Sequence, residues 1–177
     1  MKSIALLTLF LATLINGCKK DLPEPQLPPY TQEGKNIFAC KINGEVFVAE
    51  GVMDKNTMSP KGTDNNYMVW GNDTIVEIRA VEKKPTEASV SVDFVYTLIK
   101  DTFELNQKEN SVARISIPVE NYVFAESIFK TTDEHKGWVQ VKYFQNNILA
   151  GTFEFTAIDD RGEIIHVTDG RFDFFTK

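Results

Sequence analysis

The sequence predicts an all-β fold, either a single antiparallel β-sandwich or a partly closed β-barrel, built from hairpins and a C-terminal meander. From residue 36 onward, apolar and polar side chains alternate with a period of two. Short β-branched and aromatic runs are separated by turn residues, and no segment sustains a helical period. We expect about ten or eleven short strands, which is typical of one sandwich or barrel.

The first residues indicate export. An uncharged apolar run at residues 4–15 follows a short positively charged start. It is shorter than the ~20 residues that a membrane-spanning helix needs, so it is typical of a secretory signal. Residues 14–18 resemble a bacterial lipobox, in which the cysteine thiol takes a diacylglycerol. We therefore expect residues 1–17 to be a cleaved signal peptide and Cys18 to carry lipid. The alternative is an ordinary signal peptide with a cysteine at the cleavage point.

Residues 18–35 are predicted to be the lipidated cysteine and a proline-rich tether. Proline removes backbone donors and fixes φ, so four prolines among polar residues favour an extended chain. At ~3.1 Å per residue, such a tether could hold a domain on the order of 40 Å from the membrane. The antiparallel β domain is then expected at residues 36–177.

The composition limits the partners and the source of stability. The net charge of −6 argues against binding to nucleic-acid backbones and to anionic lipid headgroups. If Cys18 carries lipid, Cys40 is the only other cysteine in the chain, and no intramolecular disulfide can form. Because Cys40 alternates with Phe38 and Ile42, we expect it in the core as a small apolar group.

The strongest local signal is a hairpin over residues 37–49. Asn43 and Gly44 readily take the positive φ of a type I′ turn between two alternating runs. In that register Cys40 lies opposite Phe47.

The rest of the chain gives a sequence of predicted elements. The central part is expected to contain a loop at 52–66, strands at 67–70, 74–81, 88–94, 102–105 and 112–118, and a short helix at 125–130. The meander is expected to contain strands at 138–144, 148–157, 163–168 and 171–175. Asp169 and Gly170 are predicted to form a tight hairpin turn, and Gly151 a bulge or a close backbone approach.

Asp169, Arg171 and Asp173 are the most suggestive polar set. On a strand, Arg171 and Asp173 share a face, and a bidentate contact between guanidinium and carboxylate is easy to form. They could recognise a ligand. The favoured interpretation is structural, with Asp169 fixing the turn and Arg171 pairing with a carboxylate on the adjacent strand.

Metal binding is not expected. The two histidines, His135 and His166, lie in different elements, and His166 is out of phase with its apolar neighbours. The acidic turn at 159–163 could bind calcium, but it lacks a calcium-loop pattern, and aspartates are common in turns because they bond their own backbone.

No catalytic residues and no cofactor are predicted. The chain has no readable phosphate loop, nucleophile elbow or Ser/His/Asp set, and no spacing selects a carboxylate pair. An aromatic platform for sugar or peptide could be drawn, although aromatics in strands are more often packed in the core. Its members would be Tyr67, Trp70, Trp138, Tyr143 and Phe144.

Both ends of the domain resemble those of known lipoproteins. Residues 32–38 leading into Cys40 and residues 43–47 are similar to the opening of uncharacterised lipoproteins of the Bacteroidetes phylum. Residues 151–155 and 168–173 are similar to their closing motif. The resemblance implies an all-β domain and a cell-envelope location, and it implies no catalytic residues.

Together these observations predict a lipid-anchored, non-enzymatic binding or interaction module at the outer membrane, facing either the periplasm or the cell surface. The membrane contact would be the lipid on Cys18, and the partner a protein or a glycan. One alternative is a small-ligand or glycan-binding barrel with an aromatic-lined cavity of several hundred Å³. A glycan-active enzyme is a third hypothesis, which rests on compartment and fold analogy.

Overall fold

The computed structural model describes residues 26–49, 63–70, 73–81, 88–108, 111–118 and 126–176. Cys18, the predicted signal and the first part of the tether lie outside these residues. These described residues form eleven strands: β1 (Ile37–Ile42), β2 (Glu45–Val48), β3 (Thr63–Trp70), β4 (Asp73–Val81), β5 (Ser89–Tyr96), β6 (Thr102–Leu105), β7 (Val112–Pro118), β8 (Glu126–Lys130), β9 (Gly137–Gln145), β10 (Ile148–Ile158) and β11 (Ile164–Phe175). Among the described residues no helix is long and apolar enough to cross a bilayer.

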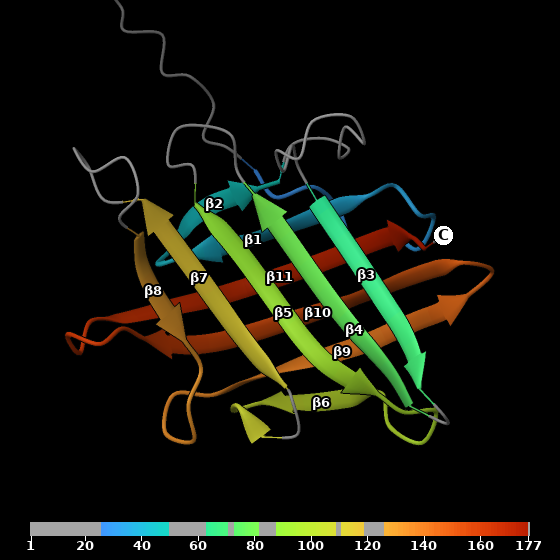
Figure 1. The fold of residues 1–177 in the computed structure, drawn as a ribbon. Coiled ribbons are helices and arrows are strands. Elements are labelled where there is room, and N and C mark those ends of the chain that lie inside the picture. The colour runs from blue at the N-terminus through green and yellow to red at the C-terminus, as the bar shows by residue number, and fades with distance from the viewer. Residues whose placement is uncertain are drawn as a thin grey trace, which may run out of the picture.

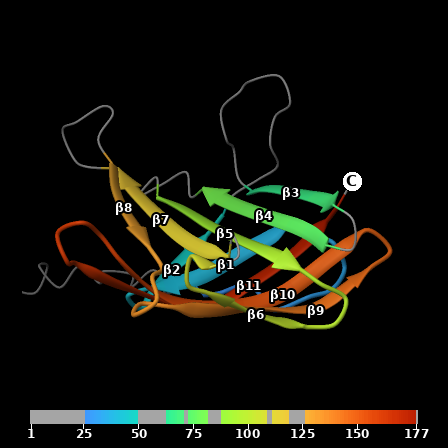
Figure 2. The ribbon, with the colours of Figure 1, turned by 60° about the horizontal axis from the view of Figure 1, so that its bottom comes forward.

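All strands belong to one antiparallel sheet that curls into a half-barrel. The order is β2-β1-β11-β10-β8-β7-β5-β4-β3, while β9 pairs with β10, and β6 pairs with β9. Figures 1 and 2 show β3, β4, β5 and β7 lying across β1, β11, β10 and β9 as two facing layers. β8 lies at the corner, where Lys130 pairs with Ile158 of β10. The predicted all-β class is confirmed.

The N-terminal hairpin forms as its sequence predicts. Asn43 and Gly44 have φ values of 50° and 90°, and Cys40 lies opposite Phe47. The turn is also bonded to β11, because the backbone N–H of Asn43 donates to the carbonyl oxygen of His166 at 2.9 Å. Cys40 is fully buried, in agreement with its predicted place in the core.

The predicted helix at 125–130 is wrong. Residues 126–130 form β8, which pairs with β7 along its whole length. Phe129 lies opposite Ile115 in this pairing, and both side chains are buried. Burial of Phe129 on the sheet decides the structure here, because a short segment has little intrinsic helical stability to set against tertiary packing.

The predicted hairpin at Asp169 and Gly170 is also wrong. β11 runs without a turn from Ile164 to Phe175, and it carries one extra residue near Asp169 relative to both of its neighbours, β1 and β10. Asp169 has a φ of 55°, so the residue chosen for a turn makes a β-bulge instead. The bulge shifts the alternation, so that Val167 before it and Phe172 after it both face the core.

The predicted loop at 52–66 ends earlier than expected. Thr63 already belongs to β3 and lies opposite Ala80 of β4, so the hairpin extends over eight residue pairs. The remaining part of the predicted loop lies outside the described residues. The other predicted strands agree with the structure to within a few residues.

Stacked phenylalanines fill the core. The Phe153 ring lies 4.9 Å from that of Phe38 and 6.5 Å from that of Phe172, measured between centroids. Gly151 lets this cluster close: a Cβ at that position would lie 2.1 Å from the Gln140 carbonyl oxygen and 2.5 Å from Cζ of Phe172. The register of β9 on β10 also shifts at Gly151. The predicted close approach is therefore present, while the extra residue of the register shift, Lys142, belongs to β9 and not to the strand of Gly151.

Candidate binding groove on the outer face of the sheet

Asp173 holds the N-terminal segment against the domain. Its side chain is 1% exposed, and its carboxylate accepts hydrogen bonds from the Thr31 hydroxyl at 2.5 Å and the Gly34 N–H at 2.8 Å. The N–H groups of Glu33 and Lys35 donate to it at 3.1 and 3.3 Å. These bonds lower the pKa of Asp173, although burial by itself raises it. The acceptor oxygens of this carboxylate are thus already bonded to residues 31–35 of the same chain.

Arg171 adds a second bond to this segment, whereas the Asp169 side chain pairs with β1. The Arg171 guanidinium donates to the carbonyl oxygens of Asp169 at 3.2 Å and Pro28 at 3.0 Å. The Asp169 carboxylate pairs with the Lys41 ammonium at 2.8 Å. The final part of the predicted tether, residues 28–35, is therefore bonded along the outer side of β11, and we call it the strap.

The acidic turn at 159–163 is closed by its own hydrogen bonds. The Asp159 carboxylate accepts from the backbone N–H groups of Arg161 and Glu163 at 2.9 Å each, and from the Arg161 guanidinium at 2.8 Å. No group of three or more His, Cys, Asp or Glu side chains among the described residues could hold a metal ion. His166 is exposed and contacts the Thr156 hydroxyl oxygen at 3.2 Å.

The five residues of the proposed aromatic platform have different surroundings. Trp138, Tyr143 and Phe144 of β9 are half-buried, and Phe144 packs edge-on against Tyr96 at 5.2 Å. The side chains of Tyr67 and Trp70, on β3, are outside the described set. The structure therefore describes no common surface made by these five side chains.

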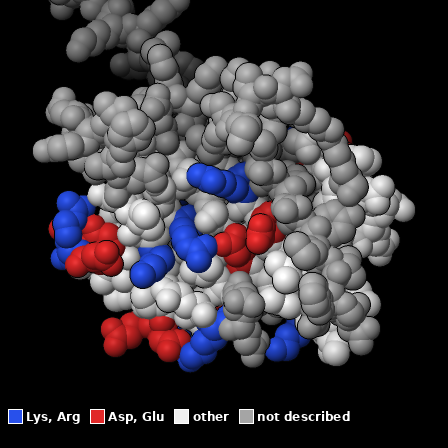
Figure 3. Space-filling view, viewed as in Figure 1, with Lys and Arg blue, Asp and Glu red and all other residues white. Residues whose placement is uncertain are grey.

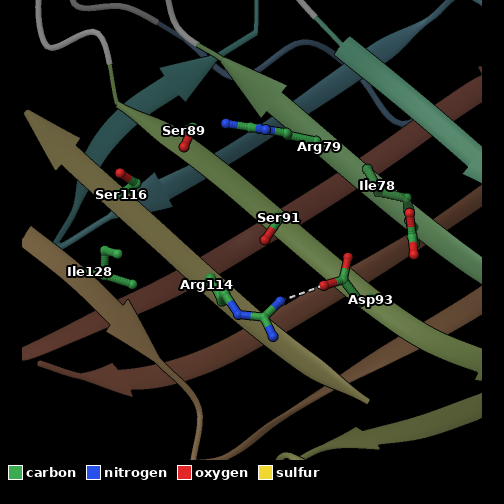
Figure 4. Close-up of a pocket in the computed structure, with 9 residues that line it drawn as sticks. Ile78, Arg79, Ser89, Ser91, Asp93, Arg114, Ser116 and Ile128 are labelled. Carbon is green, nitrogen blue, oxygen red and sulfur yellow. Dashed lines mark hydrogen bonds and ion pairs between the residues drawn. The ribbon is translucent and has the colours of Figure 1, made fainter. Parts of the chain in front are cut away.

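A polar groove lies on the outer face of the sheet, over β4, β5, β7 and β8 (Figures 3 and 4). Its volume is about 470 Å³, which falls within the range of small-ligand sites. Two other hollows have about 270 and 220 Å³. The described lining residues are Glu77, Ile78, Arg79, Ser89, Ser91, Asp93, Arg114, Ser116 and Ile128.

The strand register explains why this face is hollow. Ser91 lies opposite Arg79 on one side and Arg114 on the other, while Ser89 lies opposite Ser116. Since directly opposite residues share a face of the sheet, three short serine side chains form a floor between longer ones. Across the strands, the line of paired residues through Arg79, Ser91 and Arg114 continues to Asp64 of β3 on one side and to Lys130 of β8 on the other. The exposed Ile128 adds an apolar wall.

One end of the groove is closed by an ion pair. Nη1 of Arg114 donates to Oδ2 of Asp93 at 2.6 Å. Burial raises the pKa of Asp93, the Arg114 guanidinium opposes this rise, and the carboxylate of Glu77, which lies opposite Asp93, adds to it. The pair is half-exposed, so its net contribution to stability is below about 1 kcal/mol.

Arg79 differs from the other arginines. Arg114 and Arg161 pair with carboxylates, and Arg171 bonds two carbonyl oxygens. Arg79 is exposed and has no hydrogen bond or ion pair with the side chains that the structure describes. Figure 4 shows its guanidinium extending toward Ser89, whereas that of Arg114 extends toward Asp93. Among the side chains that the structure describes, the groove thus offers a cation without a partner beside two serine hydroxyls.

The sequence alone did not reveal this groove. Its members come from four strands and span residues 77–128, so only the register brings them to one place. The usable signal was the run Ser89, Ser91, Asp93 on the polar side of a half-buried strand. Short side chains on the outward face of a strand predict a hollow there. The residues that lie opposite them on the neighbouring strands follow only from the strand pairing.

Comparison with known proteins gives no relative from which to infer a role. A scan against protein-family models and searches of curated proteins and of solved structures gave no match. The resemblance to Bacteroidetes lipoproteins therefore stays a prediction.

Proposed function

We propose that the chain is a lipid-anchored, non-enzymatic binding module of the cell envelope, and that its ligand occupies the groove formed by β4, β5, β7 and β8. The observation that carries this proposal is the hollow of about 470 Å³, with its serine floor and charged walls, on a solvent-facing surface. Paired strands that serve only stability need no such hollow on their solvent side. The partner would be a glycan or another polar molecule, or a protein segment that enters the groove.

The position of the groove suits a ligand that arrives from outside. The strap is bonded to β11, whereas the groove lies over β4, β5, β7 and β8. Figure 2 shows β4, β5 and β7 in the layer that faces β11. A domain held through its N-terminal segment would therefore present the groove away from its point of attachment. The core between the layers is filled with buried side chains, which counts against an aromatic-lined barrel mouth.

A groove-blocking substitution tests the binding site. Ser91→Tyr places a ring on the floor between Arg79 and Arg114 and should abolish binding of glycans captured from an array by the full chain. Thr156→Tyr, on a strand of the other layer, is the control. Binding that survives Ser91→Tyr would show that the ligand lies elsewhere.

The anchor is tested separately. Metabolic labelling with a clickable fatty acid should mark the wild-type protein and leave Cys18→Ser unmarked. Label retained by Cys18→Ser would contradict lipidation at that residue and, with it, the proposed membrane contact.

A glycan-active enzyme is the second candidate, and one observation favours it. Glu77 and Asp93 lie directly opposite each other in the groove, and burial together with Glu77 raises the pKa of Asp93. Glycoside hydrolysis uses two nearby carboxyl groups, one of them with a raised pKa. Hydrolysis of a polysaccharide by the wild type that is lost in both Glu77→Gln and Asp93→Asn would establish this activity and overturn the non-enzymatic proposal.

A further inference from the structure

We infer that the groove selects acidic sugars, and that Arg79 with Ser89 and Ser91 receives the anionic group of the ligand. This inference rests on the proposed binding role of the groove and specifies its ligand class.

The first argument is that Arg79 has no partner among the residues that the structure describes. Of the four arginines in the chain, it alone has no bond to the side chains or backbone that the structure describes. Its guanidinium is a rigid fork of donors that matches a carboxylate. A ligand carboxylate would give these donors an acceptor without breaking any described contact.

The second argument is the floor beneath it. Ser89 and Ser91 have no other described hydrogen bond, and each hydroxyl can donate to an anion. The backbone places Ser91 opposite Arg79, and strands lie about 4.8 Å apart, so one group above the floor is within reach of the guanidinium and a hydroxyl. Hydrogen bonds to a charged acceptor are stronger than those between neutral groups.

The third argument concerns the remainder of the ligand. Glu77 and Asp93 line the same groove and, when ionised, only accept hydrogen bonds. A ligand that satisfies them must carry donors such as hydroxyl groups. A molecule with one carboxylate and several hydroxyls meets both ends of the groove, and an acidic sugar is such a molecule. The overall charge of −6 does not oppose this match at short range, since charges more than about 10 Å apart are largely screened at 0.1 M salt.

The test compares two probes built on the same chain of three sugars. The detergent-solubilised full chain is titrated in a calorimeter with trigalacturonate and with its methyl ester, which lacks the charge. The acid should bind at least about tenfold more tightly than the ester, the effect of one charge-assisted contact. Arg79→Gln should remove this difference, so that acid and ester bind with equal affinity. Lys100→Gln removes the same charge from an exposed turn outside the groove and should change neither affinity.

The outcomes separate this inference from the proposed function. Equal binding of acid and ester, with both lost in Ser91→Tyr, would overturn the anionic selectivity and leave the groove as a binding site. Binding that Ser91→Tyr does not affect would overturn both the anionic selectivity and the groove as the binding site. No binding of the acid at millimolar concentration, or a preference for the acid that survives Arg79→Gln, would overturn the inference. Unchanged thermal unfolding of Arg79→Gln establishes that a lost preference is local.

Discussion

The Thr31 hydroxyl donates to the Asp173 carboxylate at 2.5 Å, although the two residues lie 142 positions apart in the chain. Three backbone N–H groups of the strap donate to the same carboxylate. A single buried side chain on β11 therefore organises the segment through which the domain would be tethered.

Replacement of Asp173 should destabilise the protein. Asp173→Asn keeps the shape of the side chain but replaces one acceptor oxygen by a donor that faces backbone N–H groups. We expect the free energy of unfolding, measured with urea, to fall by about 1–3 kcal/mol, the cost of leaving buried groups unsatisfied. Asp160→Asn, at an exposed turn position, is the control and should change it by less than about 0.5 kcal/mol. Equal effects of the two substitutions would contradict the role of the strap.

The contribution of Asp173 to the free energy of unfolding should depend on pH. Hydrogen bonds from Thr31 and from the backbone of residues 33–35 outweigh burial and hold its pKa below the ordinary value. An acid whose pKa is lower in the folded state stabilises the fold above its unfolded pKa of about 3.9, and this stabilisation is lost as the pH falls through the lower folded value. The stability difference between wild type and Asp173→Asn should be constant near neutral pH and shrink below about pH 4. A difference that grows on acidification would be inconsistent with the lowered pKa.

Gly151 should not tolerate a side chain. The Cβ of Gly151→Ala would overlap the Gln140 carbonyl oxygen and the Phe172 ring, so either the β9 pairing or the ring must move. We expect a loss of about 2–3 kcal/mol in the free energy of unfolding, typical of an overpacked core. Thr152→Val is the neighbouring control. The buried Thr152 hydroxyl has no hydrogen-bond partner among the described residues, so its removal should be neutral or stabilising.

Asp93 should limit the affinity of the groove for anions. Asp93→Asn removes the carboxylate that pairs with Arg114 and leaves a second guanidinium available beside the serine floor. The affinity for trigalacturonate should rise several-fold relative to the affinity for its methyl ester. Calorimetric titration of both probes measures this, and a weaker affinity for the acid would show that the ion pair itself is needed for binding.

The sequence predicted those features that depend on neighbouring residues. The Asn43-Gly44 turn follows from the φ preferences of two adjacent residues, and the alternation around Phe153 follows from a period of two. Asp169 and Gly170 were misassigned because positive φ serves a hairpin turn and a β-bulge equally well. Only the pairing of β11 with β1 and β10 distinguishes the two, and that pairing is a property of the whole sheet.

The candidate groove and the strap depend on long-range register. Nothing near Asp173 in the sequence indicates that its acceptors are used by residues 31–35, and nothing near Arg79 indicates that Ser91 lies opposite it. The residues singled out at positions 169, 171 and 173 do form a polar set, but its partners are Lys41 and the strap. A hydrophobic pattern fixes which face of a strand is buried, and it leaves open which strand lies alongside.

The attachment of the strap to β11 has a mechanical consequence. A pull on the N-terminal segment meets the bonds of Asp173 and the contact between Arg171 and the Pro28 carbonyl oxygen. β11 is paired on one side with β1 and on the other with β10, so traction passes into the middle of a layer rather than to a free edge. A pulling force then acts as shear on the hydrogen bonds to both neighbouring strands. A domain held in this way would resist the force without first separating its two layers and exposing the core.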